Sequence, residues 1–357
     1  MIGARRLRFV MAGDAGSGSV PCGMSMLVVP LVGPFHRRFP RYNAVTVLEG
    51  LKAAEPATIL TSAVPPGGFA DPAWRDVEEP ALDPVVTWAS RRGVAVEGVG
   101  EPSPDPAAQA DFARYLQDSE RAVPALAAVR EAESELADLL GSALDLSRIH
   151  DALLPVLAKL HEARLEAFGD GPGSDWMEER ADRMMEHLAA SKVDGAALLV
   201  PVDHWASLTS RLDATGVAWH PLREVAPSEE ARVRALLDVA LAGESDEPAA
   251  LLEALAEVQT PEARLAEAEV LLRFGEVEEA LARVRTASTM DFVEPAWLPG
   301  WLLARLGQLA DVTGARDEAL RAYRGALALT WVPSVAREAA EAGLQEPFTL
   351  PSAEGDA

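Results

Sequence analysis

The sequence predicts an α/β fold with a split, mostly parallel sheet and a long helical insertion, followed by an all-α domain of helical hairpins. Three observations predict it. Short apolar runs alternate with helical patterns over residues 25–99, as in strand–helix–strand units with parallel strands. A stretch rich in Leu, Ala, Glu and Arg (residues 107–191) then separates a fourth apolar run from the first three. Beyond Pro227 only helical patterns remain.

Each predicted strand is a short apolar run that ends at a breaker. The first is Met26–Val32, ended by Gly33; its Pro30 predicts either an edge position or a bulge. The others are Ala57–Ala63, Val94–Val99, Asp194–Val202 and a short strand at Val217–Trp219. Helices are expected at residues 41–54, 84–92, 175–191 and 204–213.

The chain divides into four predicted parts. Residues 1–24 form a loose leader that contains Arg5, Arg6 and Arg8, and its apolar stretch is too short for a secretory signal. Translation from Met24 or Met26 is an equal alternative. Residues 25–225 form the α/β domain, residues 226–345 the helical domain and residues 346–357 a flexible tail.

Composition excludes several function classes. The formal net charge is −24, so the surface repels phosphate groups, and nucleic acid is not an expected partner. No apolar run approaches the roughly 20 residues that span a bilayer. The single cysteine excludes an intramolecular disulfide and a cysteine-rich zinc site. We therefore expect a cytoplasmic protein.

Two similar stretches lie in the predicted helical domain. In each, a helix ends at a glycine (Gly275 and Gly314) and a second helix follows with Ala280 or Ala319 on its inner face. These stretches resemble tetratricopeptide repeats, although Gly314 follows Gly275 by 39 residues and the usual period is about 34. The resemblance implies a peptide or protein partner; ordinary helical hairpins are the alternative.

Two histidines follow predicted strands. His36 comes directly after the first strand in the motif Gly-Pro-Phe-His, and His204 follows the fourth strand in Val-Pro-Val-Asp-His. Ligands of parallel α/β sheets bind at the carboxyl ends of strands, so the two imidazoles are expected at one edge. There they could hold a divalent metal ion that activates water. The alternative is two surface histidines, with Asp203 as a helix N-cap.

The order of these motifs resembles the TraB/Tiki/ChaN-like superfamily over about residues 26–220. The matching features are Gly-Pro-Phe-His after the first strand, the helical insertion, Glu179-Arg180-Ala-Asp-Arg-Met on a helix, and the strand that precedes His204. Tiki members of that group are metal-dependent proteases, and other members are linked to peptide pheromone inactivation, haem handling or ester hydrolysis. The resemblance implies a metal-dependent, peptidase-like hydrolase.

By position, the resemblance makes His36 and His204 the metal ligands. Arg180 becomes the group that binds an oxyanion or carboxylate, and Glu179 a group that holds one of the site residues. The alternative for Glu179 is an exposed ion pair with Arg183, four residues on.

Three positions depart from the family pattern. Ser62 stands where an acidic residue is expected, Pro201 where glycine is usual, and Ala181 where asparagine is usual. Asp203 or Asp71 would then have to replace the missing carboxylate. The second hypothesis is therefore an inactive relative that binds a peptide or protein through its repeat-like helices.

Overall fold

The structure of the chain is a computed structural model. It describes residues 25–101, 114, 123–168, 172–243, 245, 247–291 and 295–350. The predicted leader lies outside the described residues, as do the start of the helical insertion and residues 351–357 of the predicted tail. Among the described residues, no helix is long and apolar enough to cross a membrane.

A five-stranded parallel sheet forms the centre of the molecule, in the order β3-β2-β4-β1-β5. The strands are β1 (Met26–Leu31), β2 (Thr58–Thr61), β3 (Ala95–Gly98), β4 (Ala197–Pro201) and β5 (Trp219–Pro221). The predicted split is confirmed, because β4 follows the helical insertion in sequence and pairs between β2 and β1.

The expectation that Pro30 marks an edge strand or a bulge is wrong. β1 lies between β4 and β5, and Pro30 is in regular register with Val200 of β4. Met26 and Val28 bond toward β5, since Met26 N–H donates to the Ala218 carbonyl and the Val28 carbonyl accepts from Leu222. Because backbone groups alternate along a strand, the nitrogen of Pro30 also points toward β5. The last β1–β5 pair is Val28 with Pro221, so β5 ends before Pro30 and no carbonyl of β5 is left without a donor because proline lacks an N–H.

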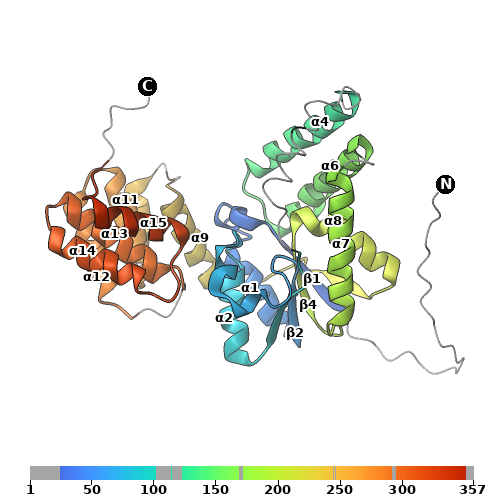
Figure 1. Cartoon of the computed structure of the whole chain (residues 1–357), viewed down its shortest axis with the longest axis horizontal. Coiled ribbons are helices and arrows are strands. Elements are labelled where there is room, and N and C mark those ends of the chain that lie inside the picture. The colour runs from blue at the N-terminus through green and yellow to red at the C-terminus, as the bar shows by residue number, and fades with distance from the viewer. Residues whose placement is uncertain are drawn as a thin grey trace, which may run out of the picture.

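Helices cover both faces of the sheet. On one side lie α1 (Ala44–Ala54) and α2 (Leu82–Arg92), which contact each other; on the other lie α7 (Pro172–Ala190) and α8 (Val202–Thr215), as Figure 1 shows. The side chain of Asn43 caps α1 by accepting from Val45 and Thr46, and its amide group donates to the Ala231 carbonyl.

The helical insertion projects away from the sheet. It contains α4 (Val123–Leu140), the short α5 (Leu146–Arg148), a π-helical turn (Ile149–Leu153), α6 (Leu154–Phe168) and α7. α4 and α6 lie side by side and pack through a small cluster centred on Val129, Ala132 and Leu160 (Figure 1). The predicted helical character of this region is therefore present in the described residues.

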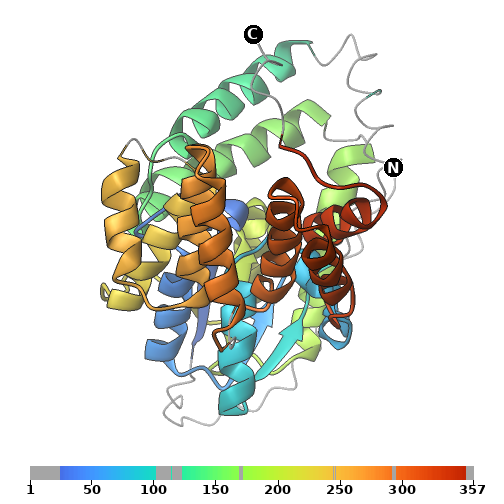
Figure 2. The same ribbon diagram turned by 90° about the vertical axis from the view of Figure 1, so that its left-hand side faces the viewer.

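The rest of the chain is helical and stacks as a separate layer beside α1 and α2 (Figures 1 and 2). Its helices are α9 (Glu229–Ala242), α10 (Pro248–Ala256), α11 (Pro261–Arg273), α12 (Val277–Ser288), α13 (Leu298–Val312), α14 (Arg316–Leu327) and α15 (Ser334–Gln345). Gly275 and Gly314 have positive φ at the turns between α11 and α12 and between α13 and α14, as expected for sharp connections between antiparallel helices.

α9 joins the helical layer to the α/β part. It packs against α1 and the short 3-10 helix η1 (Gly33–Arg37). Within the layer, Arg234 of α9 pairs with Asp238, 2.9 Å away, and with Glu262 of α11, 2.6 Å away, and all three side chains are largely buried. A second contact joins the two parts where the Asp83 carboxylate of α2 accepts from the Ala296 N–H at 3.0 Å.

Candidate functional site

Four strand exits meet at one edge of the sheet. Because all strands are parallel, β3, β2, β4 and β1 present their carboxyl ends together, in that order. The residues that follow them are Glu101, Ser62, Asp203 with His204, and His36. Arg180 of α7 contacts Glu101 at this edge. We call Ser62, Glu101, Arg180, Asp203 and His204 the edge site.

Ser62 is buried at the end of β2 by a close approach of two chain segments. Its N–H donates to the Leu199 carbonyl of β4 at 3.0 Å, which extends the strand pairing by one residue. A Cβ on Gly100 would lie 2.3 Å from the Ser62 carbonyl oxygen, so only glycine allows this approach. Ser62 is 0% exposed and its hydroxyl has no hydrogen-bond partner among the described residues. Such a group is costly unless a ligand or water satisfies it.

His204 lies in the first turn of α8, directly above β4. It is 9% exposed, and neither ring nitrogen has a hydrogen-bond partner in the described part of the chain. Asp203 Oδ2 lies 3.5 Å from Nε2. Burial lowers the pKa of His204; the Asp203 charge opposes this and the Arg180 charge adds to it. The imidazole is therefore neutral at pH 7 and offers one donor and one acceptor.

The proposed N-cap role of Asp203 is wrong. The residue at the N-cap position of α8 is Pro201, which makes no side-chain cap, and Asp203 lies within the first turn. Its carboxylate is exposed, at 72% of its surface, and its negative charge is favourable near a helix N-terminus. Asp203 is thus available to a ligand at the edge.

Arg180 and Glu101 connect α7 to the end of β3. Arg180 Nη2 donates to the Glu101 carbonyl at 2.9 Å. The Glu101 carboxylate bonds both Arg183 Nε and His187 Nε2 at 3.0 Å, and it is mostly buried. Burial lowers the pKa of Arg180, and the charges of Asp203 and Glu101 oppose that shift. Arg180 is therefore held at the edge site, in electrostatic range of Asp203 and His204.

Glu179 faces away from this group. Its side chain is 68% exposed and pairs with Arg183 at 3.5 Å, which is the exposed i,i+4 pair that was the alternative for this residue. Asp71, a suggested substitute carboxylate, accepts from the Ala73 N–H at 2.9 Å and caps the 3-10 helix η3 (Pro72–Asp76).

His36 belongs to a separate buried cluster that it forms with Tyr42 and Glu79. Its Nδ1 donates to the Tyr42 carbonyl at 2.8 Å, and its Nε2 accepts from the Val32 N–H at 3.2 Å. Glu79 Oε1 lies 3.4 Å from Nε2, and the Tyr42 hydroxyl donates to the Pro30 carbonyl at 2.6 Å. The imidazole is 0% exposed, so both ring nitrogens are satisfied within the protein.

The Glu79 carboxyl holds the Gly-Pro-Phe-His segment in place. Oε2 accepts from the Gly33 N–H and Oε1 from the Ala81 N–H, each at 3.0 Å. Gly33 has φ of 59°, a conformation that favours glycine. Burial raises the pKa of Glu79 to about 8 and lowers the pKa of His36 to about 4. Both groups are therefore neutral at pH 7, as expected for a closed polar cluster in a core.

The donor set at this edge fits a metal ion in part. Both ring nitrogens of His204 lack a hydrogen bond within the described residues, but Nε2 of His36 already accepts from the Val32 N–H and is not open to an ion. However, no group of three or more His, Cys, Asp or Glu side chains in the described ranges is arranged to hold an ion. The structure brings Arg180, Asp203 and His204 together and gives His36 different partners.

Three residues of these clusters were missed from the sequence: Glu101, Tyr42 and Glu79. Glu101 lies two residues after the third predicted strand (Val94–Val99), so the rule that selected His36 and His204 would have found it. Tyr42 and Glu79 carry no such signal, because Tyr42 lies in a predicted helix (residues 41–54) and Glu79 in an irregular, proline-rich loop 43 residues after His36.

Comparisons with known proteins assign no family to this chain. No family model matches it, and no curated protein or solved structure matches it either. The similarities to the TraB/Tiki/ChaN-like superfamily and to tetratricopeptide repeats are therefore hypotheses that rest on the sequence motifs.

Proposed function

We propose that this chain is a hydrolase whose reaction centre is the edge site, with His204 as its central residue. The observation that carries the proposal is a pair of buried side chains whose polar atoms form no hydrogen bond within the part of the chain that the structure describes. The Ser62 hydroxyl and both His204 ring nitrogens lack hydrogen bonds among the described residues, and they follow neighbouring strands. Buried groups of this kind are normally satisfied, so a bound ligand or water accounts for them.

The chemistry of the edge site supports proton transfer and stabilisation of negative charge. A neutral imidazole can accept a proton from a water molecule that attacks a carbonyl carbon and return it to the leaving group. Arg180 supplies positive charge for the oxyanion that forms, and its bond to the Glu101 carbonyl holds the side chain at the edge. Asp203 is near enough to His204 to stabilise the imidazolium that forms during transfer.

A divalent ion would add to this chemistry where it is bound. His204 is the residue that would hold it, whereas His36, the other ligand expected from the sequence, would first have to release the Val32 N–H from its Nε2. Such an ion would supply water that is deprotonated near neutral pH. The peptide bond is the proposed substrate linkage, by the resemblance to Tiki proteases. The residues of the edge site carry the hydrolytic proposal with or without the ion.

The experiment is a hydrolysis screen with matched histidine variants. The purified full chain is tested on a panel of fluorogenic peptides and carboxylic esters, while bound metal is measured by elemental analysis. We expect His204→Ala to lower the rate at least about 100-fold, which is typical for loss of a general base. The control is His161→Ala, whose ring lies against Glu178 on α6 and α7. An unchanged rate in His204→Ala contradicts the proposal.

Metal analysis distinguishes a hydrolase that uses a bound metal ion from one in which the His204 imidazole alone activates water. Stoichiometric metal that is lost in both His36→Ala and His204→Ala supports a metal-dependent hydrolase. Metal that is lost only in His204→Ala places the ion at the edge site without His36. A wild-type chain that hydrolyses substrate without metal supports the imidazole as base.

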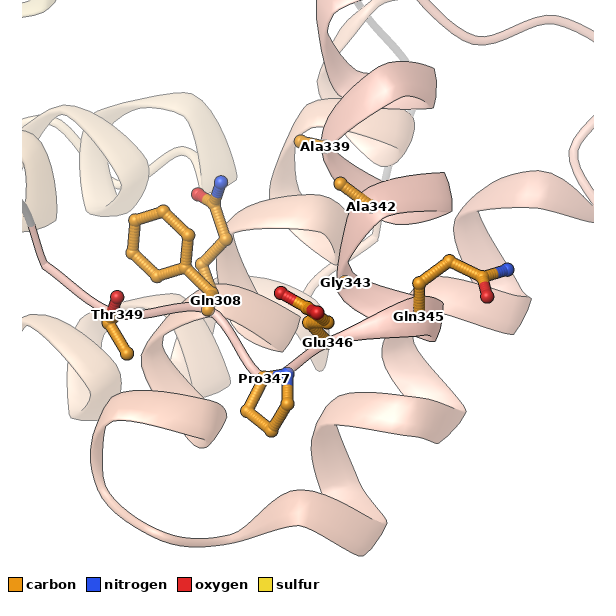
Figure 3. A pocket seen from close by; sticks show the side chains of 9 residues that line it. Gln308, Ala339, Ala342, Gly343, Gln345, Glu346, Pro347 and Thr349 are labelled. Atoms are coloured by element: carbon orange, nitrogen blue, oxygen red, sulfur yellow. The ribbon is translucent and has the colours of Figure 1, made fainter.

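A second candidate function is a peptide- or protein-binding module. The specific observation is that the Phe348 N–H donates to the Asp311 carboxylate of α13, and that Glu346–Thr349 line a hollow together with residues of α13 and α15 (Figure 3). The α11–α12 and α13–α14 hairpins pack with small residues at their contacts, which is the feature that resembles tetratricopeptide repeats. Binding of a peptide without hydrolysis of any panel substrate would favour this function.

A further inference from the structure

Glu101 joins the end of the sheet to α7 at the edge site. The residue before it, Gly100, is held at the exit of β2, where its N–H donates to the Val64 carbonyl at 2.8 Å. A Cβ on Gly100 would lie 2.3 Å from the Ser62 carbonyl oxygen, so the two chain segments are in close contact. The main chain that leads into Glu101 is therefore fixed by the same close approach that buries Ser62.

Three side chains from one face of α7 converge on Glu101. Arg180, Arg183 and His187 are spaced three and four residues apart, so they project from the same side of the helix. Arg180 Nη2 donates to the Glu101 carbonyl at 2.9 Å, whereas Arg183 Nε and His187 Nε2 bond the carboxylate oxygens Oε2 and Oε1 at 3.0 Å each. The Glu101 side chain is 15% exposed, so these bonds are partly shielded from water.

The bonds to the carboxylate determine where the carbonyl of the same residue lies. A single bond from Arg180 to this carbonyl would orient the guanidinium weakly if Glu101 could turn away from α7. The two bonds to the carboxylate oppose that movement, because hydrogen bonds to an ionised group are stronger than those between neutral groups. The Arg180 guanidinium is thus kept in electrostatic range of Asp203 and His204.

We propose that Glu101 is a positioning residue of the hydrolase, whose carboxylate, bound by Arg183 and His187, orients Arg180 toward the oxyanion that forms on the substrate. Glu101 acts through Arg180 and does not contact the substrate itself. This inference rests on the proposed function and adds a requirement to it. The reaction needs the bonds between α7 and the end of β3 as well as the Arg180 charge.

A double-mutant cycle on the full chain tests whether Glu101 acts through Arg180, with the panel substrate that the wild type cleaves fastest. Arg180→Met removes the charge, and we expect it to lower kcat about 100-fold. Glu101→Ala keeps the carbonyl but loses both carboxylate bonds. We expect it to lower kcat at least about tenfold and to change KM less than about threefold, because the oxyanion forms only in the transition state.

The second half of the cycle separates positioning from a role in folding alone. In the Arg180→Met background, Glu101→Ala should change kcat less than about twofold, because the group through which it acts is already lost. A loss by the same factor in both backgrounds overturns the proposal. Glu101→Asp keeps the charge on a shorter side chain and should recover part of the kcat that Glu101→Ala loses.

Glu178→Ala is the matched control. Glu178 lies two residues before Arg180, on the opposite side of α7, and its carboxylate bonds Arg211 of α8 at 2.7 Å. The substitution therefore removes an ion pair of the same helix and should leave kcat unchanged. A loss of kcat as large as that of Glu101→Ala would show that any lost ion pair of α7 slows the reaction, and would overturn the proposal.

A measurement that needs no activity distinguishes the failure of this inference from the failure of the hydrolase proposal. In NMR relaxation of the full chain with ¹⁵N-labelled arginine, the Arg180 Nε–H signal is identified by its absence in Arg180→Met. We expect this group to be rigid in the wild type and in Glu178→Ala, and mobile on the ps–ns timescale in Glu101→Ala. Equal mobility in all three proteins overturns the inference even if the chain is a hydrolase. Increased mobility in Glu101→Ala, in a chain whose wild type cleaves no panel substrate, would support Glu101 as the residue that orders Arg180 and reject the hydrolase.

Discussion

Replacing Glu79 with glutamine tests whether the cluster behind the Gly-Pro-Phe-His segment is neutral in the folded protein. Glu79 accepts two backbone N–H groups, from Gly33 and Ala81, and its side chain is 4% exposed. Glutamine keeps one acceptor oxygen but turns an amide N–H toward the other donor. At pH 5 we expect the variant to be less stable by roughly 1–3 kcal/mol, the cost of a buried unpaired donor.

The pH dependence of this difference follows from the pKa of Glu79. The pKa rises from 4.5 to about 8 on folding, so between these values the folded state keeps a proton that the unfolded state has lost. The stabilisation that the protonated Glu79 carboxyl gives the folded state is fully present below pH 4.5 and is lost as the pH rises through 8. A shift of this size corresponds to about 5 kcal/mol, at 1.36 kcal/mol for each pKa unit. Glutamine does not titrate, so Glu79→Gln becomes the more stable form at pH 9.

The assay is urea unfolding at pH 5, 7 and 9, followed by tryptophan fluorescence and circular dichroism. Titration of His36, whose pKa is lowered to about 4, removes stability from wild type and variant alike as the pH falls below 6.5, so it cancels in the difference. The exposed Glu257→Gln is the control. A wild-type-minus-variant difference that stays constant from pH 5 to pH 9 refutes a protonated Glu79.

Three further substitutions test the packing around Ser62, the buried ion pairs of Arg234 and the contact between α13 and α15. Gly100→Ala places a Cβ 2.3 Å from the Ser62 carbonyl oxygen, so it should displace Ser62 and lower hydrolysis; Gly325→Ala, with its nearest contact at 3.5 Å, should leave the rate unchanged in the same assay. Arg234→Met leaves the buried carboxylates of Asp238 and Glu262 without their cation and should cost about 3–5 kcal/mol in chemical unfolding. The exposed Arg232→Met on the same helix should cost less than about 1 kcal/mol, and equal costs would refute the role of burial. Gly343→Ala brings a Cβ to 2.3 Å from the Tyr323 ring and should cost roughly 1–3 kcal/mol in thermal unfolding, whereas a neutral effect would mean that the α13–α15 contact is loose.

Local patterns were sufficient to predict the sheet. β1, β2 and β4 lie in short apolar runs that end at glycine, proline or a polar residue, and the alternation with helices implies parallel pairing. The position of Pro30 could not be predicted, because its tolerance depends on how short β5 is. β5 itself lies at Trp219–Pro221, two residues later than expected, since three residues carry little periodic signal.

The candidate site was predictable only where it follows strands. His204, Asp203 and Arg180 come together because β4 and α7 place them at the same edge. The environment of His36 depends on Tyr42 and Glu79, which approach it through tertiary packing of irregular segments. Sequence spacing alone does not reveal that a histidine at a strand end is satisfied by its own backbone.

A crystal structure of the purified full chain would show what satisfies the Ser62 hydroxyl and the His204 ring nitrogens. We expect an ordered water molecule, ion or other ligand within about 3.2 Å of both the Ser62 hydroxyl and a His204 ring nitrogen. Side chains that instead hydrogen-bond to protein atoms, with no ordered group between them, would contradict a reaction centre at this edge.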